Sequence, residues 1–368
     1  MRQCQWVRSR GCQQHVRDHA TVCNCRKQHF VHTLSHGRRQ TTECKPIMNP
    51  ECVEIQVKGN AVKVPATEIN GRRVVVSGKW LKLAVVQDEE VVEGEVVDDP
   101  EIFIGKLKSD ELKADIFTFR QRFPDVSPRF KYSLEWDNLA IIPITSFDNW
   151  WKSLSQETRR NVRISGKRAV VVKAVEFDDE FVKGIKGIYD ETPMRQGRRF
   201  WHYGKGFETL KKENGTYRER SEFIGAYYNN ELIGFLKMIY VDQTASIMQI
   251  LSRNDHCDKR STNALIAKAV EICAEKGKSH LIYCKYAYGN EEDSSLAEFK
   301  RRNGFEKLLI PRYYVPLTAK GNLAIKFKLH RGIREVLPRS LLVLLLKLRT
   351  RYYEFKSRKN TKNATVAA

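Results

Sequence analysis

The order of predicted elements between residues 169 and 316 constrains the fold of this chain most strongly. Residues 169–175 form a β-branched run that is too short for a helix, and a longer stretch with helical spacing of apolar residues follows it. Residues 223–228 and 232–241 then flank Asn229-Asn230-Glu231, and Asn tolerates the positive φ that a hairpin turn requires. This part of the chain therefore predicts a strand, two helices and a β-hairpin.

The rest of the region predicts a strand, a helix, a strand, a helix and a strand. Residues 245–252 should pair antiparallel with the hairpin, because consecutive strands are usually neighbours. Apolar residues then recur at helical spacing up to Gly277, which is typical of a left-handed C-cap position. The runs 280–287 and 308–317 predict strands around a short helix that ends at Asn303-Gly304. The complete order is β-α-α-β-β-β-α-β-α-β.

This order, with its closing Phe-Lys-Arg-Arg-Asn-Gly-Phe motif at 299–305, resembles the GNAT acyltransferase superfamily over residues 130–318. Residues 153–163, 166–172 and 189–204 resemble the opening segments of its Fem-like branch, which includes peptidoglycan-bridge aminoacyltransferases and many bacterial relatives. The resemblance implies an α/β (α+β) fold with a GNAT-like mixed, largely antiparallel central sheet flanked by helices. A small β-rich N-terminal unit precedes it.

The same resemblance implies an acyltransferase that moves an acyl or aminoacyl group to an amine. Its donor would be acyl-CoA or aminoacyl-tRNA, and its acceptor a small-molecule, lipid-linked or peptide amine. The chain departs from the family at two places: residues 253–263 contain no glycine, and Lys300 stands where many members have a Tyr that protonates the leaving thiolate. A catalytically degenerate binding module of the same fold, located at a membrane surface, is the alternative.

Charge and composition divide the chain into four parts. The formal charge is +21, and residues 1–47 and 319–359 account for +7 and +10 of it, because they carry nine and twelve Lys/Arg against two carboxylates each. The region between them is close to neutral, so a duplex-DNA groove is not expected there. We expect an N-terminal extension (1–47), a β-rich unit (48–130), a Fem-like GNAT domain (131–318) and a basic helical tail (319–368).

The first 47 residues contain five of the nine Cys and five of the nine His. A zinc site is one interpretation, but no Cys-x-x-Cys pair is present. The segment also lacks hydrophobic periodicity. We therefore predict a disordered or non-native extension and no metal.

The chain has no apolar run of the roughly twenty residues that a membrane-spanning helix requires. Its beginning also lacks the apolar core of a signal peptide, so we expect a cytoplasmic location. Residues 337–359 combine a short leucine-rich run with many cations, which is typical of a helix lying on the inner face of a membrane. A helix docked on the domain would have the same pattern, and both interpretations stay open.

Arginines at helical spacing predict a phosphate-binding face before the first strand of the domain. Arg159 and Arg163 fall four residues apart, with Arg160 beside them, so one helix face carries a stripe of positive charge. Guanidinium groups bind phosphate oxygens in pairs, and the donor would supply the phosphates. A solvated basic face is the alternative interpretation.

Residues 195–205 hold the densest group of functional side chains. His202 is a candidate general base because its ordinary pKa lies near neutrality, and Glu191 is the competing base. Tyr203 is the third candidate catalytic residue, and a structural role for His202 is the alternative. A backbone N–H in the strand at 247–252 should stabilise the carbonyl oxygen of the donor. The predicted binding residues are Arg195, Gln196, Arg198, Trp201, Lys205, Gln249 and Asn263, with Arg159, Arg160 and Arg163.

Overall fold

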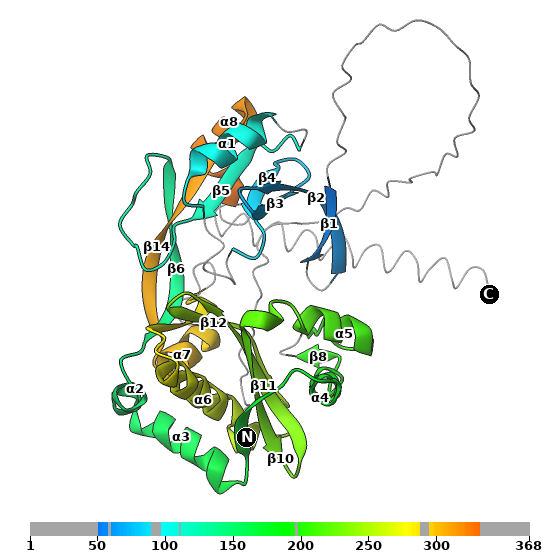
Figure 1. Ribbon diagram of the computed structural model, residues 1–368, viewed down its shortest axis with the longest axis vertical. Helices are drawn as coiled ribbons and strands as arrows, with labels where there is room; N and C mark the ends of the chain where they lie inside the picture. The colour runs from blue at the N-terminus through cyan, green and yellow to red at the C-terminus, as the bar shows by residue number, and fades with distance from the viewer. Residues whose placement is uncertain are drawn as a thin grey trace, which may run out of the picture.

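The computed structural model describes residues 51–57, 60–89, 97–109, 112–195, 198–287 and 294–331. Its largest element is a 12-stranded mixed sheet in the order β1-β2-β3-β4-β5-β14-β6-β13-β12-β11-β10-β7. Neighbouring strands pair antiparallel except β4 with β5 and β12 with β13. The sheet runs through two lobes, which Figure 1 shows above and below a narrower middle.

The first lobe is built on the N-terminal strands. Its elements are β1 (Glu51–Val57), β2 (Asn60–Ile69), β3 (Arg72–Ser77), β4 (Leu83–Val86), α1 (Pro100–Ser109), β5 (Ile116–Arg120) and α8 (Ala319–Lys326). Phe103 of α1 packs against Phe117 of β5 with ring centroids 5.7 Å apart, in a core that also includes Tyr313. Burial of these rings holds α1 on the sheet, since large aromatic side chains dominate core energetics.

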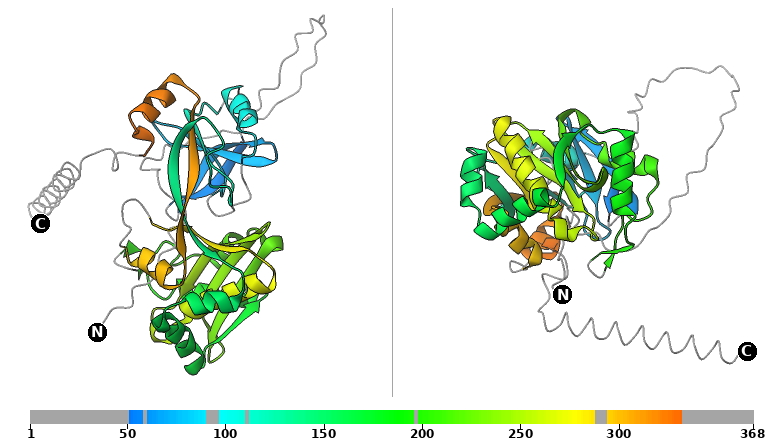
Figure 2. Two further views of the ribbon diagram at one scale, coloured as in Figure 1. Left: turned by 90° about the vertical axis from the view of Figure 1, so that its left-hand side faces the viewer. Right: turned by 90° about the horizontal axis from the view of Figure 1, so that it is seen from below.

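The second lobe contains the order of elements predicted from the sequence. It comprises α2 (Phe147–Ser153), α3 (Gln156–Lys167), β7 (Val171–Val175), α4 (Asp179–Tyr189), α5 (Phe207–Asn214), β10 (Ser221–Tyr228), β11 (Glu231–Val241), β12 (Thr244–Ser252), α6 (Ser261–Glu275), β13 (His280–Lys285) and α7 (Ser295–Arg302). One apolar core packs α6 with α2, α3 and α7 on one face of the sheet, and another packs α4 and α5 on the opposite face. The two helical layers are visible in Figure 2.

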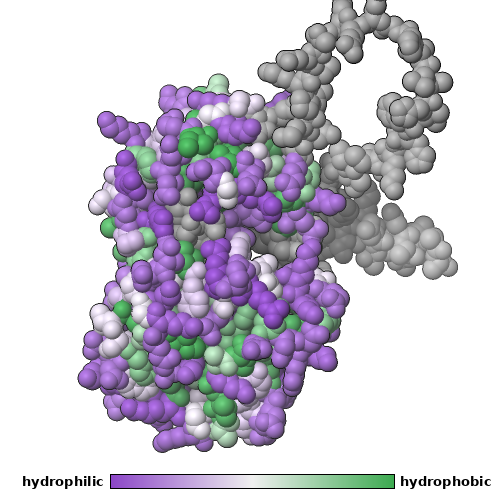
Figure 3. Space-filling view, viewed as in Figure 1, coloured by the Kyte–Doolittle hydropathy of each residue, from purple (hydrophilic) through white to green (hydrophobic). Residues whose placement is uncertain are grey.

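Two long strands belong to both lobes. β6 (Ser133–Pro143) and β14 (Glu306–Pro316) pair antiparallel along most of their length. The last five residues of β14, from Arg312, also pair with β5, whereas β6 pairs with β13 in the second lobe. The middle of the molecule is therefore a hydrogen-bonded ladder, and Figure 3 shows the narrower zone around it on a largely hydrophilic surface.

The structure confirms the predicted fold class, a mixed and largely antiparallel sheet flanked by helices, and each element of the predicted order. Among the α-helices and strands of the described residues, five were not predicted: α1, α2, β6 and the two-residue strands β8 (Met194–Arg195) and β9 (Arg198–Arg199), which lie where a loop was expected. The extension at 1–47 and the segment 337–359 lie outside the described residues. Of the helices in the described part of the chain, none is long and apolar enough to cross a bilayer.

Candidate functional site

The candidate site lies where β12 and β13 separate. The two strands pair in parallel only from Thr244 to Ser246 and from His280 to Ile282, although β12 continues to Ser252 and β13 to Lys285. A register shift in the β11–β12 pairing makes Met248 an extra residue on β12. We call Ile247–Ser252 with Tyr283–Lys285 the divergence point.

The backbone N–H and C=O of Ile250 point toward the edge of β12 that is no longer paired with β13. The Arg253 amide donates to the carbonyl of Ile233 at 2.8 Å, so Arg253 faces β11. Hydrogen-bonding direction alternates along an antiparallel strand, so the N–H and C=O of Ile250 point away from β11. A backbone N–H in this position is able to stabilise a developing oxyanion.

The start of α6 lies directly after the divergence point. The link from β12 carries Arg253, Lys259 and Arg260, and Arg260 has a φ of +57° without a side-chain cap for the helix. The Ser261 Oγ is buried and has no hydrogen-bond partner among the described residues. The first amides of a helix have no intrahelical acceptor, so this end of α6 offers backbone N–H groups and cations to an anion.

Tyr283 stands on β13 immediately after its pairing with β12 ends. The side chain is 1% exposed, and its hydroxyl has no hydrogen-bond partner among the described residues. Burial raises the pKa of Tyr283 far above its usual value, so the hydroxyl stays protonated. The Lys300 ammonium donates to the backbone carbonyls of Tyr283 and Lys285. This group therefore holds the end of β13.

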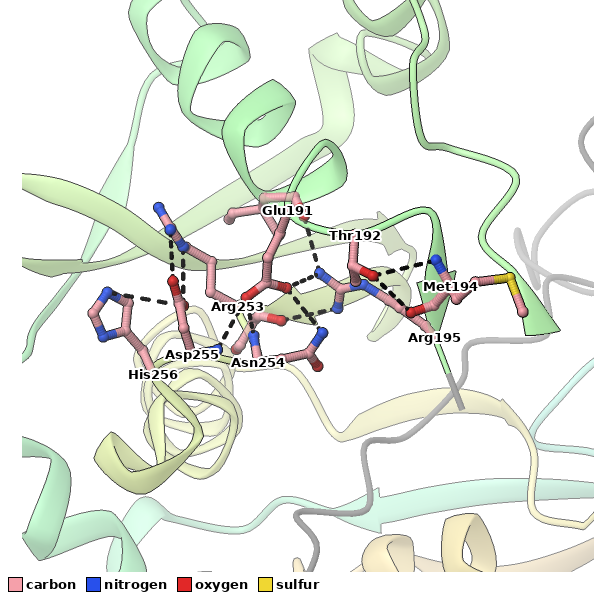
Figure 4. Close-up of polar contacts among 10 residues, drawn as sticks. Glu191, Thr192, Met194, Arg195, Arg253, Asn254, Asp255 and His256 are labelled. Carbon is pink, nitrogen blue, oxygen red and sulfur yellow. Dashed lines mark hydrogen bonds and ion pairs between the residues drawn. The ribbon is translucent and has the colours of Figure 1, made fainter. Parts of the chain in front are cut away.

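Glu191 and Arg195 join α4 to β12 and to the link before α6 (Figure 4). The Glu191 carboxylate accepts hydrogen bonds from the Asn254 side chain at 2.9 Å, the Asp255 amide at 3.0 Å and Arg195 at 2.7 Å. Arg195 donates in addition to the carbonyl oxygens of Ser252 and Ile188, at 3.1 and 2.9 Å. Because its oxygen atoms already accept these hydrogen bonds, Glu191 is better suited to position neighbouring groups than to act as a general base.

His202 lies in an aromatic setting beside this pair. Its ring centroid is 4.5 Å from that of Tyr189 and 5.3 Å from that of Phe200. Burial, assisted by the charges of Lys205 and Arg195, lowers the pKa of His202 to about 3. The ring is neutral at physiological pH and is a weak proton acceptor, which counts against the predicted role of general base.

Gln249 connects the divergence point to that aromatic group. Its side-chain amide donates to the Tyr189 hydroxyl, and its cross-strand neighbour is Lys237 of β11. The Lys237 ammonium donates to the Asn214 carbonyl at 2.8 Å, and burial lowers its pKa to about 8. The structure thus brings together Glu191, Arg195, His202 and Gln249 from the residues predicted as site members.

The other predicted residues near 200 take varied positions. Tyr203 is 46% exposed, and the Lys205 ammonium contacts both oxygens of Glu213 at 2.8 and 2.7 Å. Trp201 is half-buried. Arg198 lies on β9 (Arg198–Arg199), which pairs with β8 (Met194–Arg195), but its side chain and Gln196 lie outside what is described.

The predicted arginine stripe lies elsewhere. Arg159, Arg160 and Arg163 are on α3, which packs against the α6 side of the sheet, whereas the group around His202 lies on the α4 side. Arg159 donates to the Lys152 carbonyl at 3.1 Å. Asn263 donates to the Asn303 side chain at 2.9 Å, which links α6 to the end of α7. The predicted residues therefore do not form one cluster.

Sequence reasoning missed Tyr283 and Ser261. Tyr283 stands in an apolar run that predicts a buried strand, and Ser261 follows the charged residues 258–260 at the start of a predicted helix, so neither stands out by itself. Among the described residues, no group of three or more His, Cys, Asp and Glu is placed to hold a metal ion.

Comparisons with known proteins concern the fold. No family model matches the chain, and neither does any curated protein. The chain is similar to the solved structure of L-PGS from Bacillus licheniformis, with 12% identity, 73% of this chain and 88% of that chain covered, and a TM-score of 0.48. It is similar to FemX, with 12% identity, 72% and 87% covered, and a TM-score of 0.46.

The chain is also similar to a smaller acetyltransferase structure. This is the PaiA N-acetyltransferase from Thermoplasma acidophilum in complex with coenzyme A, with 15% identity, 40% of this chain and 99% of that chain covered, and a TM-score of 0.28. FemX and a putative acetyltransferase of the GNAT family are thus among the similar structures, as the resemblance in the sequence predicted. Similarity of this degree assigns no donor, acceptor or catalytic residue to this chain.

Proposed function

We propose that this protein is an acyltransferase that binds an activated acyl donor at the divergence point and transfers the acyl group to an amine. The observation that carries the proposal is that two buried hydroxyl groups, Tyr283 on β13 and Ser261 at the start of α6, have no hydrogen-bond partner among the residues the structure describes. A buried hydroxyl without a partner costs about 1–3 kcal/mol, so natural proteins retain few of them. A ligand that satisfies both would explain why they are kept.

The geometry suggests a role for each group. Phosphates of the donor would lie at the start of α6, where Arg260 and the first amides of the helix add positive potential. The Ile250 amide would hold the carbonyl oxygen of the acyl group. The amine nitrogen would then attack the carbonyl carbon while the bond to the leaving sulfur or ribose oxygen breaks. The protonated Tyr283 hydroxyl would give its proton to that leaving atom, and the amine would lose a proton to solvent.

Acyl-CoA and aminoacyl-tRNA both meet these requirements, because each carries phosphates and an activated acyl group. Both donors are found in the cytoplasm, so the proposal implies that the protein acts there. The acceptor would approach along the α4 side, past Trp201 and Tyr203, as a small-molecule, lipid-linked or peptide amine.

The donor is tested by thermal shift of the full chain with acetyl-CoA, a longer acyl-CoA and charged tRNA. A donor at a hundred times its Kd should stabilise the protein by about 2.7 kcal/mol. Arg260→Glu should abolish the shift, whereas Lys212→Glu, an exposed cation on α5, should leave it unchanged. The absence of a shift with every donor would contradict the proposal.

The alternative is a binding module of the same fold that catalyses no transfer. Lys300 favours it, because a residue at the position of the family's proton donor is used here to hold β13. The module predicts a donor shift without any acylated product. Product formation by the wild type and its loss in Tyr283→Phe would exclude it.

A further inference from the structure

We propose that the outer face of α8, together with Trp80, is a docking surface for an anionic lipid bilayer. This docking surface consists of Trp80, Leu323, Phe327 and Leu329 with Lys79, Lys320, Lys326 and Lys328. Its hydrophobic members are 62%, 56%, 60% and 37% exposed, in that order. Large exposed apolar residues scattered singly need no explanation, but a group on one surface indicates an interaction site.

The residues of the docking surface lie on neighbouring parts of the fold. Lys320, Leu323 and Phe327 are spaced so that they share one side of α8. The Lys320 ammonium donates to the Trp80 carbonyl at 2.6 Å and lies 5.9 Å from the centroid of the Trp80 ring. The link between β3 and β4, which carries Trp80, is therefore placed beside the exposed side of the helix.

The helix is held firmly enough to present these side chains. Ala324 is 1% exposed and packs with Leu81 and Ile116 of the first lobe. A Cβ added at Gly321 would lie 2.0 Å from the Asp115 carbonyl oxygen, so α8 approaches the sheet backbone closely. The Thr318 hydroxyl accepts a hydrogen bond from the Gly321 amide at 3.0 Å and caps the helix start. The outward side chains are thus carried by a fixed element.

Charge identifies a bilayer as the partner. The two chain segments that carry the docking surface, residues 71–87 and 307–331, contain ten Lys and Arg in all and no Asp or Glu. Lys79, Lys326 and Lys328 are exposed. Exposed Trp, Phe and Leu bordered by lysines match a surface where the apolar groups enter the acyl boundary and the ammonium groups meet anionic headgroups. Lysine is depleted at the core of protein interfaces, which disfavours a protein partner.

The docking surface belongs to the lobe opposite the divergence point, as Figures 1 and 2 show. It is also distinct from the segment 337–359. The inference therefore does not rest on the proposed transferase function, and its failure would leave that function standing.

The test is sedimentation of the full chain with vesicles made of equal amounts of phosphatidylcholine and phosphatidylglycerol. Replacing Trp80, Leu323 and Phe327 together by Ser should reduce partitioning about ten-fold or more, because three partly buried apolar side chains are lost. Lys326→Glu with Lys328→Glu should reduce it as well. Neutral phosphatidylcholine vesicles should bind the wild type weakly.

Matched controls use apolar residues of similar exposure outside the docking surface. Trp136→Ser and Val171→Ser, at 50% and 58% exposed, should partition like the wild type. Brominated lipids should quench tryptophan emission in the wild type and less in Trp80→Phe. An unchanged melting temperature would show that each variant is folded.

Three outcomes would overturn the inference. One is normal partitioning of the triple Ser variant. Another is loss of partitioning only on removal of residues 332–368, which would assign the lipid contact to the chain end. The third is binding that appears only after that removal, which would mean that the chain end itself covers α8.

Discussion

The Glu191 carboxylate and the Arg195 guanidinium form a buried ion pair at 2.7 Å, with side chains 10% and 8% exposed. This pair links the segment after α4 to the end of β12 and to the link before α6. Because the Glu191–Arg195 ion pair connects these segments, we expect the geometry of the divergence point to depend on it.

Glu191→Ala should lower the free energy of unfolding by about 3–5 kcal/mol, because it leaves Arg195 buried without its charge partner. Glu231→Gln, which removes an exposed partner of Arg253, should cost only about 0–1 kcal/mol. Denaturant titration gives both values. A small loss in Glu191→Ala would show that the pair does not hold the site.

Gly304 should tolerate alanine less well than Gly277, although both have positive φ, at +82° and +63°. A Cβ at Gly304 would lie 2.8 Å from the Trp150 indole nitrogen, whereas nothing lies within 4 Å of one at Gly277. We expect a loss of about 1–2 kcal/mol for Gly277→Ala and a further ~1–3 kcal/mol for Gly304→Ala. Denaturant titration gives both losses of unfolding free energy. Equal losses for the two variants would show that Trp150 does not crowd a side chain at position 304.

His202 should make the protein sensitive to acid. Its pKa is about 3 in the folded chain and near 6.5 when unfolded, so between these values the unfolded chain binds a proton that the folded chain does not. The free energy of unfolding therefore falls as the pH decreases from 6.5 to 3.

Replacement of the titrating ring tests this. His202→Phe should reduce the acid-dependent loss of stability, whereas Phe200→Leu, which alters the same packing without a titrating group, should keep it. Stability measured at several pH values would contradict the assignment if His202→Phe and the wild type had the same pH dependence.

Tyr283→Phe should separate function from stability. Removing this buried hydroxyl, which has no hydrogen-bond partner in the described part of the chain, should leave stability unchanged or raise it. Transfer should nevertheless slow about 10²-fold or more if the hydroxyl protonates the leaving group. Tyr313→Phe is the control, because that hydroxyl donates to Gln121 at 2.7 Å in the first lobe. It should cost about 0.5–1.5 kcal/mol and leave transfer unaffected. Unchanged transfer in Tyr283→Phe would remove the residue from the mechanism.

The fold was predictable where several local sequence patterns indicate the same element. The Asn229-Asn230 turn, the C-cap at Gly277 and the strand runs each specify their element, and Asn229, Asn230 and Gly277 do have positive φ. α1 and α2 escaped prediction because each is a single short helix in a region whose other signals favour strands or loops. β6 was missed because Trp136 and Asp137 interrupt its apolar pattern. The Asp137 carboxylate is paired with Arg312 of β14 and Lys285 of β13, which are both distant in sequence.

The site was predictable only in part. Residues 195–205 attract notice as a cluster of Arg and aromatic side chains, and four of the predicted residues, Glu191, Arg195, His202 and Gln249, meet around Tyr189. The sequence does not reveal that Glu191 would be saturated with hydrogen bonds or that burial would depress the His202 pKa. Both effects come from partners in other elements, such as Asn254. The separation of β12 from β13 likewise depends on how the two strands pair, and the sequence of either strand alone does not reveal it.

The strand β14 has a consequence for how the protein is made on the ribosome. β5 has its antiparallel neighbour in β14, so the first lobe, whose other strands are synthesised early, lacks this neighbour until residue 316 has emerged. The second lobe waits for the same strand, since β6 pairs with it. Contacts between residues so distant in sequence form slowly. The N-terminal lobe therefore cannot complete folding ahead of the rest, and both lobes should acquire protease resistance together, late in synthesis.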